Sequence, residues 1–232
     1  MSLKIFGGEN GEAPKKQKFS DDIVGRFRSG YQVENGRKKT PVALQEWRVT
    51  TGDPEVAEAV RGLMGGDPAA EWDASGEDNL EVFTTSQEVE VILDGPSALR
   101  QRMILWGRNG KVIRESDGET CTDGTPDPQA GQSLQERKQA ARDGVGAEPQ
   151  IELYFRLAEN PELGIFKFQS GSWSLASDLA YNSVSEELED IDGKARATLA
   201  LEEVSFVAKQ GPRAGQTVSY TKPVVKILGP AA

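Results

Sequence analysis

LEVFTTSQEVEVIL, residues 80–93, is the stretch that indicates the fold class most directly. In its second half Val89, Val91 and Leu93 alternate with glutamates, and residues 80–84 show the same period of two. Successive side chains of a strand point to opposite faces of a sheet, so this pattern places aliphatic groups on a buried face and carboxylates in water. One dry and one wet face is typical of an antiparallel sheet.

The same period of two recurs in later parts of the chain. It predicts further strands over residues 102–106, 111–113, 151–157, 165–169, 197–201, 204–208, 216–220 and 224–228. Asn109-Gly110 predicts a hairpin through a type I′ turn, which needs two positive φ angles. Pro223 indicates an edge strand or a break, because proline cannot donate a hydrogen bond to a neighbouring strand.

Two changes of phase in this alternation predict irregular strands. In residues 41–51, PVALQEWRVTT, the apolar phase changes between Leu44 and Trp47, which indicates a bulge or a strand covered on both sides. Over residues 197–208 the apolar positions change from odd to even numbers. We therefore expect a second bulge at Glu202-Glu203.

Two segments have helical periodicity instead. One begins at Pro54, behind the capping residue Asp53, and ends at Gly65-Gly66. The other begins at residue 172 or 174 and runs to 191, with a buried stripe at helical spacing, and Gly193 ends it. We therefore predict an α+β fold: a mostly antiparallel β-sheet of roughly ten strands, two main helices and one long polar loop.

The chain divides into few parts. The loop over residues 116–148 has no apolar pattern, contains Cys121, and is expected to be either functional or disordered. Within it, Ser133 and Glu136 predict a capped short helix over 137–142. The expected parts are a flexible basic tail over 1–22, a single α+β domain over 23–228 that contains the polar loop, and a tail over 229–232.

The composition excludes several classes of function. The 232 residues contain no histidine and one cysteine, so histidine-dependent triads and cysteine-rich zinc sites are excluded. The net charge is −10, and only the first fifty residues are basic, at +4. No apolar run is long enough to span a bilayer, and MSLKIFGG has no apolar signal core, so we do not expect a signal peptide. We expect a cytoplasmic protein that is not an enzyme, uses no cofactor or metal and binds no membrane.

Candidate binding residues lie near the basic end of the chain. Arg26, Phe27, Arg28 and Tyr31 combine cations with rings, which can stack a base or hold a protein partner. The alternative is a strand in which Phe27 and Tyr31 are partly buried and the arginines point outward. Trp72 lies in a polar stretch and is either a lid over the sheet or an exposed anchor for a partner.

Other residues favour structural interpretations. Three tryptophans within apolar patterns are expected in the core: Trp47, Trp106 and Trp173. Cys121 is expected to be an ordinary free thiol. Carboxylates that could ligate Mg²⁺ or Ca²⁺ are more simply read as an acidic surface, since no calcium-loop spacing is present: Asp21, Asp22, Asp67, Asp73, Glu77 and Asp78.

Whole segments of the chain resemble a known family. The segments are GRFRSGYQ (25–32), PVALQEWRVTTGDPEVAEAV (41–60), GEDNLEVFTT (76–85), VEVILDGPSALRQRMILWGRNG (89–110), LGIFKFQSGSWSL (163–175) and GPRAGQTVSYTKPVVKI (211–227). Together they resemble actinobacterial and actinophage proteins that include recombination directionality factors of large serine integrases. Some relatives carry extra cysteines in the loop corresponding to 116–148, where this chain has only Cys121.

The resemblance implies a function without catalysis. Such a factor binds a large serine integrase, switches it from integration to excision, and meets DNA mainly through the integrase. Two alternatives remain open. A nucleic-acid-binding accessory protein would use the basic residues Lys15, Lys16, Lys18, Arg26, Arg28, Arg37, Lys38 and Lys39, and a metal-dependent hydrolase would use carboxylates alone.

Overall fold

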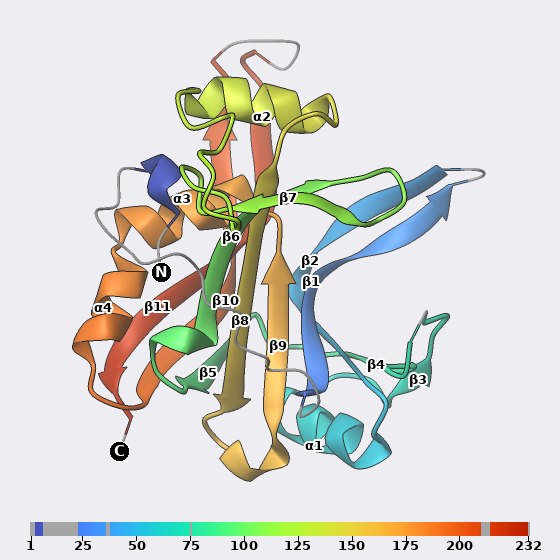
Figure 1. The fold of residues 1–232 in the computed structure, drawn as a ribbon. Helices are drawn as coiled ribbons and strands as arrows, with labels where there is room; N and C mark the ends of the chain where they lie inside the picture. Colours follow the sequence, from blue (N-terminus) through green and yellow to red (C-terminus); the bar gives the residue numbers. More distant parts are fainter. Residues whose placement is uncertain (1–2, 7–22, 36–37, 75, 210–213, 232) are drawn as a thin grey trace.

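The computed structural model describes residues 3–6, 23–35, 38–74, 76–209 and 214–231. Within them the chain is α+β, with eleven strands in one mixed, mostly antiparallel sheet and four α-helices (Figure 1). The strands are β1 (Ile23–Asn35), β2 (Lys38–Thr51), β3 (Ala70–Glu71), β4 (Leu80–Phe83), β5 (Glu88–Leu93), β6 (Leu99–Trp106), β7 (Val112–Ser116), β8 (Glu148–Leu157), β9 (Ile165–Ser170), β10 (Ala195–Val207) and β11 (Thr217–Pro230). The α-helices are α1 (Pro54–Met64), α2 (Leu134–Arg142), α3 (Trp173–Tyr181) and α4 (Val184–Asp190).

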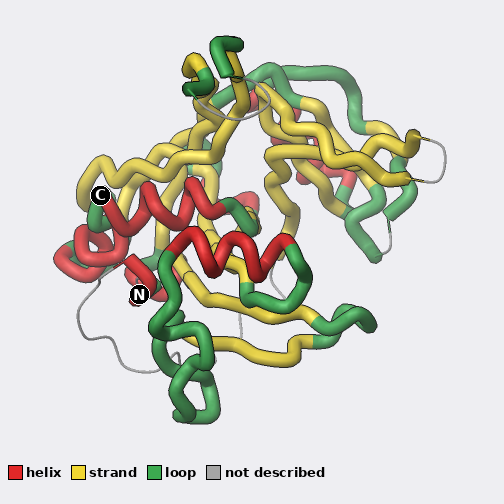
Figure 2. Tube along the Cα trace, turned by 90° about the horizontal axis from the view of Figure 1, so that it is seen from above, coloured by secondary structure: helices red, strands yellow, loops and turns green. Residues whose placement is uncertain are grey.

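The sheet runs in the order β11-β10-β5-β8-β9-β1-β2-β4-β3, with the β6–β7 hairpin joined to β8. Every pairing is antiparallel except that of β1 with β9. The ribbon of β1 and β2 projects to one side, and α3 and α4 lie on the opposite side (Figure 1; Figure 2). Because β10 and β11 also approach β2, the sheet curves around the core.

Aromatic side chains form the centre of that core. The Phe27 ring meets the rings of Trp47, Phe155 and Phe166 edge to face, with centroids 5.6, 5.1 and 5.6 Å away. Trp47 also meets Phe168 at 5.3 Å. Edge-to-face geometry suits the ring quadrupoles and adds stabilisation beyond the burial of area.

Of the two alternatives for residues 41–51, a bulge and a strand covered on both sides, the bulge is confirmed. Arg28 pairs with Arg48, but Gly30 pairs with Ala43, so two steps along β1 correspond to five along β2. Glycine is needed at residue 30, because a Cβ there would lie 2.6 Å from the Val42 carbonyl oxygen. A bulge bends and twists a strand pair, which turns the outer half of the ribbon away from β9.

The first predicted helix is confirmed as α1. Its cap is as expected: the Asp53 carboxylate accepts a hydrogen bond from the Glu55 amide at 2.8 Å, and Pro54 is the first helical residue. The second predicted helix is wrong as a single element. It is divided into α3 and α4 at Ser183, whose φ of 52° is left-handed. Periodicity continues through such a corner, because both helices bury an apolar stripe.

The strands near the chain end need two corrections. The register of β10 with β11 is continuous from Ala197 to Val207, so the bulge expected at Glu202-Glu203 is absent from the described ladder. The second half of β10 is largely exposed. Its apolar residues therefore need not lie on one buried face, and a change of phase there does not require a bulge. The segments 216–220 and 224–228 form the single strand β11, and Pro223 lies on a sheet edge as one alternative predicted.

The β6–β7 hairpin is confirmed, but its turn is not type I′. Gly110 has a φ of 73°, whereas Asn109 does not have a positive φ. The Gly110 amide donates to the Gly107 carbonyl at 2.9 Å, which makes a type I turn followed by a glycine bulge. Trp106 is 39% exposed beside this turn, so its expected place in the core is wrong; Trp47 is buried and Trp173 packs partly buried against the core.

The first described residues pack onto the body of the protein. Leu3 is fully buried, and the Lys4 amide donates to the Asp117 carbonyl at 3.0 Å. For residues 3–6 the structure therefore differs from the expected flexible tail, while residues 7–22 lie outside the described part. A single leucine in a segment without an apolar pattern gives no sequence signal that it packs into the core.

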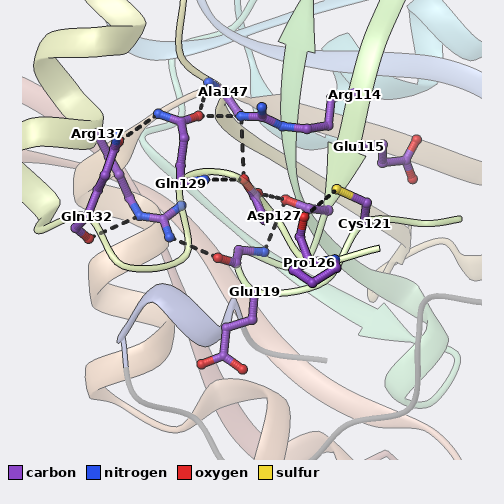
Figure 3. A network of polar contacts seen from close by, with 12 residues as sticks. Arg114, Glu115, Glu119, Cys121, Pro126, Asp127, Gln129, Gln132, Arg137 and Ala147 are labelled. Atoms are coloured by element: carbon purple, nitrogen blue, oxygen red, sulfur yellow. Dashed lines mark hydrogen bonds and ion pairs between the residues drawn. The ribbon is translucent and has the colours of Figure 1, made fainter. Parts of the chain in front are cut away.

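The polar loop between β7 and β8 is built around buried polar side chains (Figure 3). The Asp127 carboxylate accepts from the Ser116 hydroxyl and lies 3.5 Å from an Arg114 nitrogen. The Gln129 side-chain oxygen accepts from Arg114 at 2.5 Å and from the Ala147 amide at 2.9 Å. These bonds connect both ends of the loop, and α2 carries the predicted Ser133 capping box.

Candidate functional site

Strand alternation separates the candidate residues on β1. Phe27 is 2% exposed and faces the core, so Arg26 and Arg28 point to the opposite, wet face. Arg26 lies in register with Lys167 of β9, and Arg28 lies in register with Arg48 of β2. Directly paired residues share a face of the sheet, so four cations from three strands are brought together.

This wet face is hollowed into a groove of about 1030 Å³. We call it the Arg–Trp groove. It is lined by Arg26, Phe27, Arg28, Ser29, Gly30, Tyr31, Gln32, Arg48, Trp72, Asp73, Glu81, Phe83, Lys167 and Gln169. Four of the five residues singled out in the sequence thus meet at one site: Arg26, Arg28, Tyr31 and Trp72. Phe27 borders the groove, but its ring packs in the core.

Trp72 lies just after β3 and covers the arginines. Its amide donates to the Asn79 carbonyl at 3.0 Å, and its indole nitrogen donates to the Asp78 carbonyl at 2.7 Å. The guanidinium carbons of Arg48 and Arg28 lie 4.6 and 5.3 Å from the centre of its ring. Cations at this distance from an indole face are attracted to the ring, so Trp72 and the two arginines hold each other in place.

Three of the four cations have carboxylate partners. Arg26 pairs with Asp78 at 2.7 Å, and Lys167 pairs with Glu152 at 2.5 Å. Arg48, only 6% exposed, donates from Nε to Glu81 at 2.7 Å. A buried arginine requires such a partner, because desolvating an unpaired charge is costly.

Arg28 differs from its neighbours. Among the described residues it has no carboxylate within ion-pair distance, and its Nε donates to the Thr50 hydroxyl at 3.0 Å. Burial, and then the charges of Arg48 and Arg26, lower the pKa of the Arg28 guanidinium below its usual value, and Asp78 opposes them only in part. The surroundings of Arg28 therefore disfavour additional positive charge and favour an anion.

Two rings form the apolar part of the groove. Tyr31 is 36% exposed and Phe83 is 40% exposed, and their rings meet edge to face at 6.1 Å. The Arg48 guanidinium also lies 5.6 Å from the Phe83 ring centre. The groove thus offers a guanidinium group beside exposed aromatic surface, which suits binding of a partner that carries both an anion and an apolar group.

The groove residues that sequence reasoning missed include Arg48, Phe83 and Lys167. The signal for Arg48 was present, because Trp47 and Val49 face the core and the residue between them must face outward. The same argument applies to Phe83, which follows the buried Val82. Nothing in the alternation, however, showed that β9 would lie beside β1.

The carboxylates considered as metal ligands take other positions. Asp78 is bonded to Arg26, and Asp73 borders the groove. Asp21 and Asp22 lie outside the described residues. In the part of the chain that the structure describes, no three His, Cys, Asp or Glu side chains are grouped in a way that could hold a metal ion. Cys121 is buried, and its sulfur lies 3.9 Å from the Pro126 carbonyl oxygen.

The fold and the groove define a class: an α+β protein with a groove on the wet face of its sheet. No solved structure matches the chain. A family model described as Gp3-like, recombination directionality factor-like, matches residues 24–227. The chain therefore belongs to the recombination directionality factor-like family, which confirms the resemblance seen in its segments. None of the helices among the described residues combines the length and apolar character needed to cross a membrane.

Proposed function

We propose that this protein is a recombination directionality factor that binds a large serine integrase and switches it from integration to excision. The observation that carries the proposal is the family match over residues 24–227. The Arg–Trp groove is the surface that we assign to the integrase. The protein acts in the cytoplasm, on an integrase already bound to DNA.

Such a switch needs no chemistry of its own. The groove presents guanidinium groups, aromatic rings and amides, which suit binding better than catalysis. A factor redirects its partner by binding one arrangement of the integrase more tightly than another. Changing a 1:99 preference into 99:1 requires about 5.5 kcal/mol of differential binding, which one interface of ordinary size can supply.

The net charge of −10 supports a protein partner over nucleic acid. An acidic protein is attracted to a basic DNA-binding protein but repelled by phosphates. Most basic residues on which direct DNA binding would depend lie outside the part of the chain whose side chains are described: Lys15, Lys16, Lys18, Arg37, Lys38 and Lys39. Fluorescence anisotropy with labelled DNA at low and high salt tests this alternative, and a flat titration argues against it.

A recombination assay tests the proposal itself. The purified protein is mixed with the serine integrase encoded near its gene and with DNA carrying either the two hybrid attachment sites or the two original sites. Recombination of the hybrid sites should require the protein, and recombination of the original sites should fall when it is added. No binding to the integrase together with unchanged products in both reactions would contradict the proposal.

A further inference from the structure

We propose that the Arg–Trp groove holds a short, extended acidic segment of the partner protein, with one carboxylate bonded to Arg28 and an apolar neighbour against Tyr31 and Phe83. This inference rests on the proposed function, in which the partner is the integrase. It adds the chemistry of the contact, the strand beside which the segment binds, β1, and the residue that selects the segment, Arg28.

The pairing of charges in the groove leaves one cation, Arg28, for an anion of the partner. Arg26, Arg48 and Lys167 are matched by Asp78, Glu81 and Glu152. Arg28 remains the cation without a carboxylate partner among the described residues, and it lies directly beside Arg48. A carboxylate that bonds a guanidinium group in a partly desolvated site gains a short, charge-assisted contact.

The backbone of β1 offers a place for an extended segment. On the side of β9, the ladder of β1 ends at Phe27. From Arg28 onward, this edge of β1 has no neighbouring strand in the described sheet, because β2 lies on the other side. Residues 29–32, which belong to this part of β1, line the groove. Main-chain groups of a free edge bind an extended peptide as an added strand, and nearby side chains give the specificity.

The size and the rings of the groove fit a peptide. Its volume of about 1030 Å³ lies just above the range for small-molecule sites, which is about 300–1,000 Å³. Tyr31 and Phe83 expose aromatic surface in the same groove that Arg28 lines. An acidic residue next to an apolar or aromatic one along an extended segment would satisfy both features.

A single nucleic-acid strand fits this groove less well. It could stack bases on the rings, but its phosphates would bring several negative charges to a site with one unmatched cation. The groove also contains the carboxylate of Asp73, which repels several phosphates more strongly than a single carboxylate. The protein as a whole carries a charge of −10, which adds to this repulsion.

Selection from a library of random twelve-residue peptides displayed on phage tests the inference independently of any integrase. The native protein should enrich peptides with Asp or Glu next to an apolar or aromatic residue. In fluorescence polarisation, Arg28→Gln should lower the affinity for the best peptide at least tenfold. Arg28→Lys should restore part of this affinity. Arg142→Gln, an exposed arginine on α2, should leave binding unchanged and serves as the control.

Three outcomes would overturn the inference. One is enrichment of peptides without carboxylates, and another is binding that Arg28→Gln does not weaken. The third is tight binding of a labelled twenty-nucleotide thymidine strand that Arg28→Gln abolishes, since this would assign the groove to nucleic acid. Circular dichroism of each variant confirms that a loss of binding is not a loss of fold.

The integrase separates this inference from the proposed function. If the native protein and Arg28→Gln bind the integrase equally well, the directionality role stands, but the groove is not the surface that contacts the integrase. If the integrase does not bind the native protein although acidic peptides do, the groove stands and the proposed function fails. Agreement requires a weakened integrase complex for Arg28→Gln, with an unchanged complex for Arg142→Gln.

Discussion

Arg28 and Arg48 lie opposite each other on β1 and β2, and both guanidinium groups face the ring of Trp72, at 5.3 and 4.6 Å. Two like charges on directly opposed residues repel each other. Arg48 is stabilised by Glu81, whereas Arg28 has a hydroxyl as its hydrogen-bond partner. The pair therefore combines a residue that stabilises the fold with one that the fold leaves available.

The first prediction compares these two arginines. Arg48→Gln leaves Glu81 without its cation and should lower the free energy of unfolding by about 3 kcal/mol. Arg28→Gln should change it by less than about 0.5 kcal/mol, because the repulsion that it relieves offsets the contacts that it loses. Urea denaturation measures both. Equal losses for the two variants would refute the assigned roles.

Glu152 carries a prediction about pH. Burial raises the pKa of its carboxyl, but the hydrogen bond from Lys167 and the charges of Lys167, Arg102 and Arg100 outweigh burial, so the pKa lies below its usual 4.5. A carboxyl with a lowered folded-state pKa stabilises the protein above its usual pKa, and this contribution is lost as the pH falls through the folded-state value. Glu152→Gln should therefore have a lower free energy of unfolding than the native protein at pH 7. This difference in free energy should become smaller below pH 4.5.

Denaturation curves between pH 7 and pH 3 measure this narrowing. Glu148→Gln, at the exposed start of the same strand, controls for the loss of one negative charge. The prediction fails if the free energies of unfolding of the native protein and Glu152→Gln differ by the same amount at every pH in this range. In that case the ion pairs of Glu152 do not stabilise the fold.

Arg137 should stabilise the polar loop. It is 2% exposed, and its guanidinium donates to the Gly118 carbonyl at 2.8 Å. Arg137→Met leaves that carbonyl buried without its partner, which should lower the free energy of unfolding by about 2 kcal/mol. Arg142→Met, on the exposed side of the same helix, should stay within about 0.5 kcal/mol of the native protein. Thermal unfolding distinguishes the two, and similar midpoints would contradict the prediction.

The same substitution, serine to glycine, should have opposite effects on stability at Ser183 and at Ser177. Ser183 has a left-handed φ of 52° and no side-chain bond that caps α4, so Ser183→Gly should raise the free energy of unfolding by about 0.5–1 kcal/mol. Ser177 lies inside α3, where glycine is unfavourable, so Ser177→Gly should lower it by about 0.5 kcal/mol. A decrease for both would mean that Ser183 is not strained.

Local patterns predicted much of the fold. The period-two alternation marks β4 and β5, and the caps of α1 and α2 were readable because they involve residues within three positions of each other. The corner at Ser183 was not readable, since two short helices that bury the same stripe keep one periodicity. The place of Trp106 was also missed, because an apolar pattern continues into a hairpin that leaves the core.

The candidate site was predictable only in part. The alternation around Phe27 placed Arg26 and Arg28 on the face opposite to the core, and the polar stretch around Trp72 marked that residue as unusual. The sequence did not show that Trp72 would lie over Arg28 and Arg48. That contact depends on the pairing of β4 with β2, which joins segments far apart along the chain.

Within most of the regular strands and helices, the amino-acid sequence alone determined which side chains face the core and which face water, because the pleat of a strand and the turn of a helix act over a few residues. It also determined the family, through the order of whole segments. Only the tertiary structure decided that Lys167, Arg26 and Arg48 meet, and that Arg28 remains the unmatched cation. Strand order and the divergence of β1 from β9 follow from packing among distant segments, and such packing has no local signature in the sequence.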